Sequence, residues 1–161
     1  MNKNINLLAI SYVFGFTAAT ITVFLGAIIG SQITSIKSLS TLPVAFSVVG
    51  TAICTILAAK IMSKIGRRLG FIFAALGSSA TALVATFAIY QQNFILFCIS
   101  NLILGMGMAF THQYRFAAAE SVEKEKAPKA ISILMLSGIV AAFLGITSAN
   151  YTKNLILNHL Y

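Results

Sequence analysis

One stretch of the sequence contains no formally charged residue over 46 positions, from residue 69 to residue 114. A helix needs about 20 apolar residues to cross the roughly 30 Å hydrocarbon core of a bilayer, so this stretch is long enough for two spans. Gln91, Gln92 and Asn93 interrupt it near its middle and predict the turn between them. The stretch therefore restricts the chain to a fold in which lipid, and not water, surrounds much of the surface.

The composition extends this conclusion to the whole chain. Of its 161 residues, 58% are hydrophobic and only 9% are charged, and the mean hydropathy is +0.92. A typical soluble domain carries about 25% charged residues. The composition excludes a soluble enzyme, a disordered tail and a disulfide-stapled secreted domain. Cys54 and Cys98 both lie in apolar runs and are predicted to be buried and unreactive.

Five apolar runs are long enough to span a bilayer, at residues 7–29, 42–59, 69–90, 94–111 and 130–151. Helix is the expected state of each run, because a helix pairs its own backbone groups in lipid whereas an open sheet leaves them unpaired. The runs do not alternate as barrel strands do. The first run is too long for a signal peptide and no A-x-A cleavage site follows it, so we expect a permanent span. The predicted fold is an all-α membrane protein with about five transmembrane helices.

Basic residues give the chain a formal net charge of +8 and a pI of about 9.8. They separate the apolar runs instead of forming one basic stripe, so we interpret them by the positive-inside rule and not as a nucleic-acid surface. With the N-terminus in the cytoplasm, only Lys37 and Lys153 lie outside. Nine basic residues then lie inside: Lys3, Lys60, Lys64, Arg67, Arg68, Arg115, Lys124, Lys126 and Lys129. This count predicts a multi-pass protein of the plasma or inner membrane with a cytoplasmic N-terminus.

The longest predicted connection, residues 112–129, holds all three acidic residues, Glu120, Glu123 and Glu125. We expect a long loop whose SVEKEKAPK stretch, residues 121–129, is a polar surface segment. Pro128 suits the first turn of the last helix, where its missing N–H costs little. The chain contains no Asp, and no predicted span carries a charged residue near its centre. Since ionisable groups inside the membrane usually mark proton or ion paths, no such path is visible in this sequence.

Small residues recur at four-residue spacing within the spans, in Gly26-x-x-x-Gly30, Gly138-x-x-x-Ala142 and Ala141-x-x-x-Gly145. Such pairs place two small residues on one helix face, which lets two backbones approach closely. The alternative is that they reflect only the high frequency of small residues in membrane helices.

The segment between the second and third runs, residues 59–71, reads AKIMSKIGRRLGF. It resembles the signature loop of the major facilitator superfamily, G-x-L-A-D-R-x-G-R-R-x-x-L, in sequence and in position. Ala59 stands for the first Gly and Ser63 for the Asp, whereas the basic and glycine positions match at Lys64, Gly66, Arg67 and Arg68. The resemblance implies a tight turn whose charges pair with acids and helix ends and favour one conformation of a carrier. The alternative is a basic loop that serves only the positive-inside rule.

Residues 101–109, NLILGMGMA, resemble the R-x-x-Q-G-x-G-A-A pattern of the family's fourth helix. Gly105 and Gly107 match the glycines, and Asn101 stands for the Arg. The resemblance implies that the glycines, which lack a side chain, let this helix pack closely or bend beside a central cavity. It also implies that Asn101 can hydrogen-bond a solute but cannot hold a charge.

Arg115 and Glu120 resemble the Arg and the acid that the family often carries at the cytoplasmic end of helix four. Gly138 and Gly145 likewise resemble the glycines that helix five uses at the interface between the two halves of a carrier. Glu120 is the candidate partner of the basic loop at residues 64–68. The alternative is that Glu120 is exposed to solvent and that any ion pair it makes contributes little to stability.

Neutral polar side chains on the spans are the candidate contacts for a solute. They are Tyr12 and Thr17 on the first run and Asn101 on the fourth. Ser and Thr hydroxyls often bond to their own helix carbonyls instead. Asn101 is costly to expose to lipid, so we expect it to face either a neighbouring helix or the cavity. His112, at the end of the fourth run, is either a titrating group or a hydrated interfacial residue.

The resemblance implies membrane transport of an unidentified small solute by alternating access, in a carrier with two halves of six helices. Five spans correspond to an incomplete N-terminal bundle over residues 1–161, so we expect a truncated or split carrier that a second chain could complete. The other expected partners are the lipid bilayer and the solute, with no nucleic acid, cofactor or metal. The alternatives are a structural or assembly subunit of a membrane complex and a membrane enzyme or channel, although no motif such as H-E-x-x-H occurs.

Overall fold

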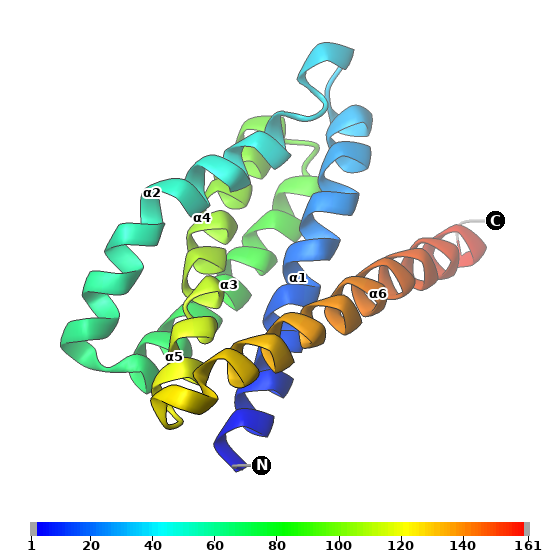
Figure 1. Ribbon diagram of the computed structural model, residues 1–161. Helices are drawn as coiled ribbons and strands as arrows, with labels where there is room; N and C mark the ends of the chain where they lie inside the picture. Colours follow the sequence, from blue (N-terminus) through cyan, green and yellow to red (C-terminus); the bar gives the residue numbers. More distant parts are fainter. Residues whose placement is uncertain (1–2, 160–161) are drawn as a thin grey trace.

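The structure is a computed structural model that describes the backbone of residues 3–159 and the side chains of residues 5–151 (Figure 1). Every element in it is helical, and five helices are long and apolar enough to cross a membrane. The predicted all-α fold with about five transmembrane helices is therefore confirmed. In chain order, the elements are α1 (Lys3–Ile33), η1 (Lys37–Leu39), α2 (Leu42–Ile65), α3 (Arg67–Tyr90), α4 (Phe94–His112), α5 (Tyr114–Glu120), η2 (Lys124–Lys126) and α6 (Ala127–His159).

The prediction of one loop over residues 112–129 is wrong, although residues 123–126, 128 and 129 are exposed, as expected of a polar surface segment. The short helix α5 and the 3-10 turn η2 occupy most of this segment. Three consecutive alanines, which favour helix, lie in α5, and two of them, Ala117 and Ala118, are buried. This segment belongs to the packed bundle because Ala118 shares a core cluster with Ala130 and Leu134 of α6.

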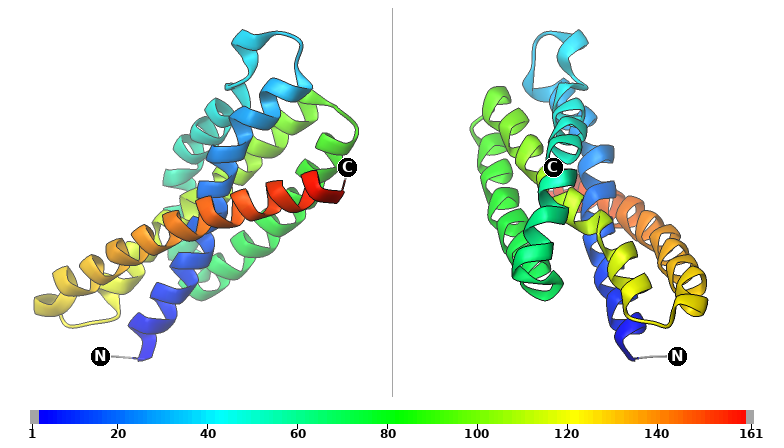
Figure 2. Two further views of the ribbon diagram at one scale, coloured as in Figure 1. Left: turned by 90° about the vertical axis from the view of Figure 1, so that its right-hand side faces the viewer. Right: turned by 60° about the vertical axis from the view of Figure 1, so that its left-hand side comes forward.

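The described helices pack chiefly in two pairs, α2 along α4 and α1 along α6, and α3 covers a further side of α4 (Figures 1 and 2). Backbones in the first pair approach closely because a glycine of each helix faces the backbone of the other helix. A Cβ atom on Gly105 would overlap the Ser47 carbonyl of α2, and one on Gly50 would overlap the Leu102 carbonyl of α4. Thr51 adds a hydrogen bond across the pair, from its Oγ1 to the Gly105 carbonyl at 2.9 Å. Small residues with an interhelical hydroxyl bond are a common way to pack helices in lipid.

The second pair, α1 with α6, also packs through glycines and one hydroxyl hydrogen bond between the helices. A Cβ on Gly138 would meet the Tyr12 ring at 3.4 Å, and one on Gly145 would meet the Thr20 side chain at 2.8 Å. Between them, Thr17 Oγ1 donates to the carbonyl of the buried Ala141 at 3.3 Å. The helix α6 crosses α1 at this contact, and its C-terminal part leads away from the other helices (Figure 2).

The first and second helices meet at two further glycines. A Cβ on Gly26 would lie 3.1 Å from the Val44 side chain, and one on Gly30 would overlap the Ser40 carbonyl. Both close approaches lie beside the start of α2.

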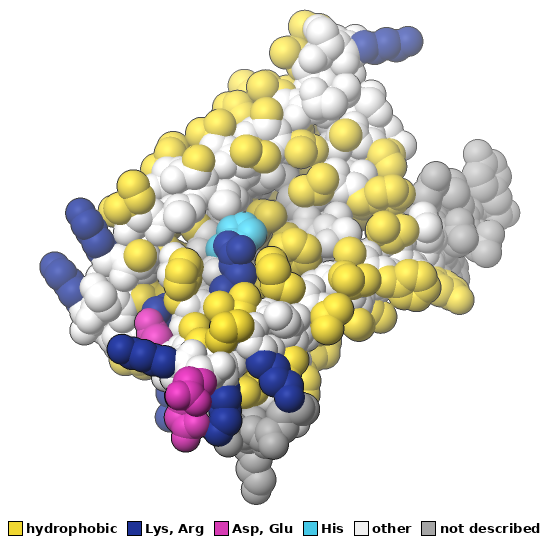
Figure 3. All heavy atoms as spheres, viewed as in Figure 1, with side chains coloured by type: hydrophobic (Ala, Val, Ile, Leu, Met, Phe, Trp, Pro, Cys, Tyr) yellow, Lys and Arg dark blue, Asp and Glu magenta, His cyan; other side chains and the backbone are white. Residues whose placement is uncertain are grey.

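The outer surface is apolar, as lipid requires. Large hydrophobic side chains such as Phe14 and Leu83 are more than 70% exposed. Charged side chains gather at the end of the bundle where α2 meets α3 and η2 precedes α6 (Figure 3). The side chains of Lys3 and Lys153, which entered the orientation count, lie outside the described part. Cys54 and Cys98 are free and buried.

Candidate functional site

The turn between α2 and α3 is the first part of the candidate site. Gly66 adopts φ +85° and ψ 152°, a conformation that only glycine reaches without strain. Ser63, in the position where the family has Asp, donates its hydroxyl to the Lys60 carbonyl at 2.8 Å and stays exposed. Lys64 and Arg68 are also exposed. Of the basic side chains in this turn, Arg67 is therefore the one that pairs with an acid elsewhere in the bundle.

Arg67 makes a bidentate ion pair with Glu120 at the end of α5. Its Nε lies 2.6 Å from Oε2 and its Nη2 lies 2.5 Å from Oε1 of the carboxylate. The two side chains are 28% and 63% exposed, so water screens the pair. The geometry matches the planar fork of a guanidinium to the two carboxylate oxygens. This contact ties the start of α3 to the end of α5, which are far apart in the sequence.

The ion pair predicts that substitutions at Arg67 and Glu120 have coupled effects on the free energy of unfolding. Arg67→Glu is expected to lower the free energy of unfolding by up to about 1 kcal/mol, because an exposed pair contributes little. The double variant Arg67→Glu with Glu120→Arg restores the opposite charges and should recover most of that loss. Unfolding of the purified chain in mixed micelles measures both, with Arg68→Glu as the control for charge reversal alone. A double variant as unstable as the sum of its single variants would contradict the contact.

Arg115 is separated from the turn, although the family resemblance grouped it with the loop charges. It lies in the first turn of α5, three residues after His112, whereas Glu120 ends that helix. No ion pair to Arg115 occurs among the residues whose side chains the structure describes. The predicted basic site is therefore divided into Arg67, which pairs with Glu120 at the end of α5, and Arg115, which lies near the start of that helix.

Aromatic side chains surround the end of α4. The Tyr12 ring stacks on Phe16 with centroids 5.4 Å apart and meets Tyr114 edge-on at 6.2 Å, and His112 meets Phe16 edge-on at 6.5 Å. Phe71 of α3 stacks on Tyr114 at 3.9 Å. Sequence reasoning considered His112 but missed Phe16, although the i, i+4 spacing of Tyr12 and Phe16 on one helix face was a usable signal.

The three residues predicted to contact a solute do not meet in one cavity. Tyr12 is only 4% exposed and packs in a core cluster with Ala118 and Leu134. Thr17 lies in the α1–α6 contact and also donates to the Val13 carbonyl of its own helix at 2.7 Å. Asn101 is 1% exposed, and its Nδ2 donates to the Phe97 carbonyl at 2.8 Å. All three therefore lie between helices in this arrangement.

A groove of about 470 Å³ lies between α1, α3 and α4. Small and hydroxyl side chains form much of its lining, from Gly15, Ala18 and Thr22 of α1, Ala74 and Ser78 of α3, and Gly107 and Thr111 of α4. A Cβ on Gly107 would overlap the Ser78 hydroxyl, so this glycine sets the approach of α3 to α4.

Five apolar helices packed through small residues, with their charges gathered at the turns, define a multi-pass helical membrane protein. The chain belongs to the Major Facilitator Superfamily, whose family model matches residues 7–152. The family consists of membrane transporters, so the chain belongs to a family of lipid-embedded proteins and not of enzymes.

Three curated transporters are similar to the chain. It is 31% identical over 159 residues to the riboflavin transporter RfnT of Brucella anthropi, and the match covers 99% of the chain and 40% of that protein. The uncharacterized transporters YdeG and YddS of Bacillus subtilis are 28% and 24% identical to it, with 97% and 89% of the chain and 36% and 33% of those proteins covered. The chain thus spans at most two fifths of the length of these relatives. No solved structure is significantly similar to it.

Proposed function

We propose that this chain forms the N-terminal bundle of an alternating-access carrier for a small solute. The observation that carries the proposal is the bidentate Arg67–Glu120 pair, which joins α3 to α5 at the charged end of the bundle. In a carrier that rocks between two states, such a pair adds stability to the state in which it forms. Ser63 leaves the turn without the acid of the family pattern, so Glu120 is the acid available to it in this structure.

The carrier works together with helices outside this sequence, either later in the same polypeptide or in a second chain. The matched relatives are more than twice as long as the chain. The groove between α1, α3 and α4 offers a surface of small residues on which a further helix packs well. Riboflavin is the first solute to test, because a transporter of riboflavin is 31% identical to the chain.

The charged end of the bundle faces the cytoplasm of a plasma or inner membrane, with the N-terminus on the same side. The support is the positive-inside rule, since exposed Lys60, Lys64 and Arg68 lie at that end and Lys37 lies at the other. A membrane-impermeant thiol reagent should label Ser63→Cys only from the cytoplasmic side. Labelling from the outside would reverse the assignment.

A chimaera tests the function. This chain replaces the matched N-terminal part of the Brucella anthropi riboflavin transporter, and riboflavin uptake is measured in cells that cannot make riboflavin. We expect uptake by the chimaera and none by the chain alone, because one bundle cannot enclose a solute path by itself. A chimaera that is folded and inserted but moves no riboflavin contradicts this solute. A folded chimaera that moves no solute at all would instead favour a structural subunit.

A further inference from the structure

Arg115 is the cation of this bundle that the proposed function leaves without a role. It is partly exposed, next to the break at which α4 ends and α5 begins. The acids of the chain do not neutralise it. Glu120 is paired with Arg67, Glu123 is paired with Lys126, and Glu125 is exposed in η2. Because Arg115 has no ion-pair partner among the described side chains, its guanidinium is free to bind an anion.

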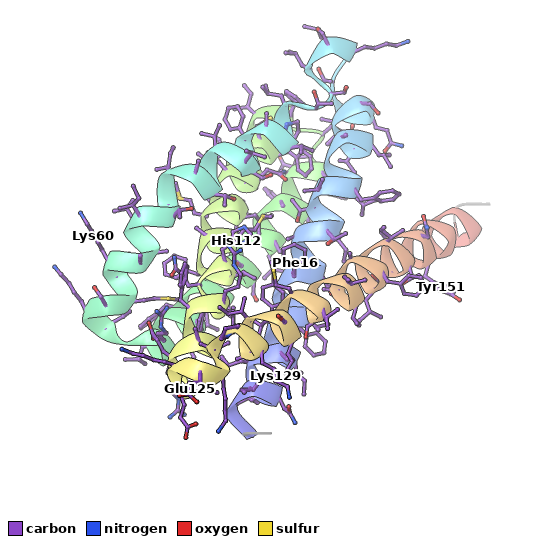
Figure 4. The ribbon with its side chains drawn as sticks, in the orientation of Figure 1. Phe16, Lys60, His112, Glu125, Lys129 and Tyr151 are labelled. Atoms are coloured by element: carbon purple, nitrogen blue, oxygen red, sulfur yellow. The ribbon has the colours of Figure 1, made fainter. Side chains whose placement is uncertain are left out.

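His112 meets Phe16 edge-on, with ring centroids 6.5 Å apart, and precedes Arg115 by three residues across the break between α4 and α5. Figure 4 shows the two labelled side chains one above the other between α4 and α1. In Figure 3 the imidazole lies near the centre of this face, between α2 and α6, beside a basic side chain. His112 and Phe16 are both partly exposed, whereas Tyr12 is buried behind Phe16 and fixes its ring by stacking. The face thus presents an aromatic ring and an imidazole with a basic side chain beside the imidazole, and Arg115 makes no ion pair with a described side chain.

We propose that Arg115, His112 and Phe16 form a recognition site for a planar aromatic solute that carries an anionic group. This proposal rests on the proposed transport function and specifies the class of its solute. Phe16 provides a ring against which a flat solute stacks or packs edge-on. The guanidinium supplies hydrogen-bond donors only, in a planar fork that suits a phosphate or carboxylate.

The charge balance of the face gives the site its selectivity. Among the residues with described side chains, all three acids lie at or beyond the end of α5 and are paired or exposed there. A cationic solute therefore meets a like charge with no acid to offset it, whereas an anion meets an unpaired partner. Anionic aromatic solutes are consequently favoured over neutral ones, and neutral ones over cations.

A lipid headgroup phosphate has the same chemistry as the anionic group of such a solute. Arg115 lies near the end of a span, so the headgroups of anionic lipids compete for it. The test must therefore separate a bound solute from a bound lipid.

Equilibrium dialysis against the whole chain in phosphatidylcholine nanodiscs tests the site. The probes are flavin mononucleotide, riboflavin and proflavine, which are flat and are respectively anionic, neutral and cationic. We expect flavin mononucleotide to bind most tightly and proflavine least. Arg115→Gln should weaken flavin mononucleotide binding by about tenfold or more and narrow its advantage over riboflavin. Phe16→Leu should weaken both flavins similarly, and Lys60→Gln, at an exposed cation on α2, should change neither.

Three results would overturn the site. They are equal binding of proflavine and flavin mononucleotide, unchanged binding by a folded Arg115→Gln variant, and no binding of any probe. Nanodiscs that also contain phosphatidylglycerol address the lipid. If that lipid abolishes flavin mononucleotide binding to the parent chain, a headgroup holds the site and the solute proposal fails. Riboflavin uptake by the chimaera, combined with unaltered selectivity in Arg115→Gln, would leave the transport function standing and reject this site alone.

Discussion

Gly105→Ala should destabilise the bundle by about 1–3 kcal/mol or more, because the added methyl group collides with backbone. The new Cβ would overlap the carbonyl oxygen of Ser47 and lie 2.7 Å from its carbonyl carbon. A side chain could rotate away from such a contact, but the α2 backbone must shift as a whole. The shift also weakens the 2.9 Å hydrogen bond from Thr51 to the Gly105 carbonyl. Unfolding of the purified protein by SDS in mixed micelles measures the loss.

Gly77→Ala is the matched control for this variant. Gly77 also lies inside a long apolar helix, but a Cβ at this position meets no atom within 4 Å. Both substitutions gain helix propensity of about 1 kcal/mol, so only the contact differs between them. Gly77→Ala should therefore be neutral or slightly stabilising. Equal stability of the two variants would show that α2 and α4 do not pack through Gly105.

Local signals predicted most of the elements of this fold. The five apolar runs gave the five long helices, because length and apolarity alone decide which segments can cross a bilayer. The turn at Gln91–Asn93 was also predictable, since Asn93 caps α4 by accepting from the Leu96 N–H at 3.0 Å. Helix α5 was missed because its apolar part is too short for a span and is embedded among charged residues.

Helix pairing was much less predictable than helix position. Small residues occur on several faces of these helices, and nothing in their spacing states which helix each face meets. Thr17 illustrates the difficulty, because a neutral hydroxyl on a span suits a solute contact and a helix contact equally well. The structure places it against the Ala141 carbonyl of α6, a partner that is distant in sequence. The partner of Arg67 was predictable because the chain contains so few acids.

Asn101→Asp should lower the free energy of unfolding by at least about 2.5–3.5 kcal/mol, which is the penalty for an aspartate at the centre of a membrane helix. Asn101 is 1% exposed, and its amide nitrogen is satisfied by the Phe97 carbonyl at 2.8 Å. Its Oδ1 has no hydrogen-bond partner among the described residues. An aspartate would therefore place a carboxyl group where the neutral oxygen already lacks a donor. SDS unfolding and the yield of inserted protein both report the loss.

Asn150→Asp makes the same chemical change at an exposed position near the end of the α6 span and should cost less than about 1 kcal/mol. The difference in stability between the two variants measures the effect of burial, because the chemical change is the same in both. If Asn101→Asp were as stable as Asn150→Asp, water or a cation would have to reach residue 101. The junction at which Gly26 of α1 approaches Val44 of α2 and Asn101 of α4 would then be an open cavity and not a packed contact. A clear excess cost at residue 101 instead means that the junction stays dry, as a packed contact between helices does.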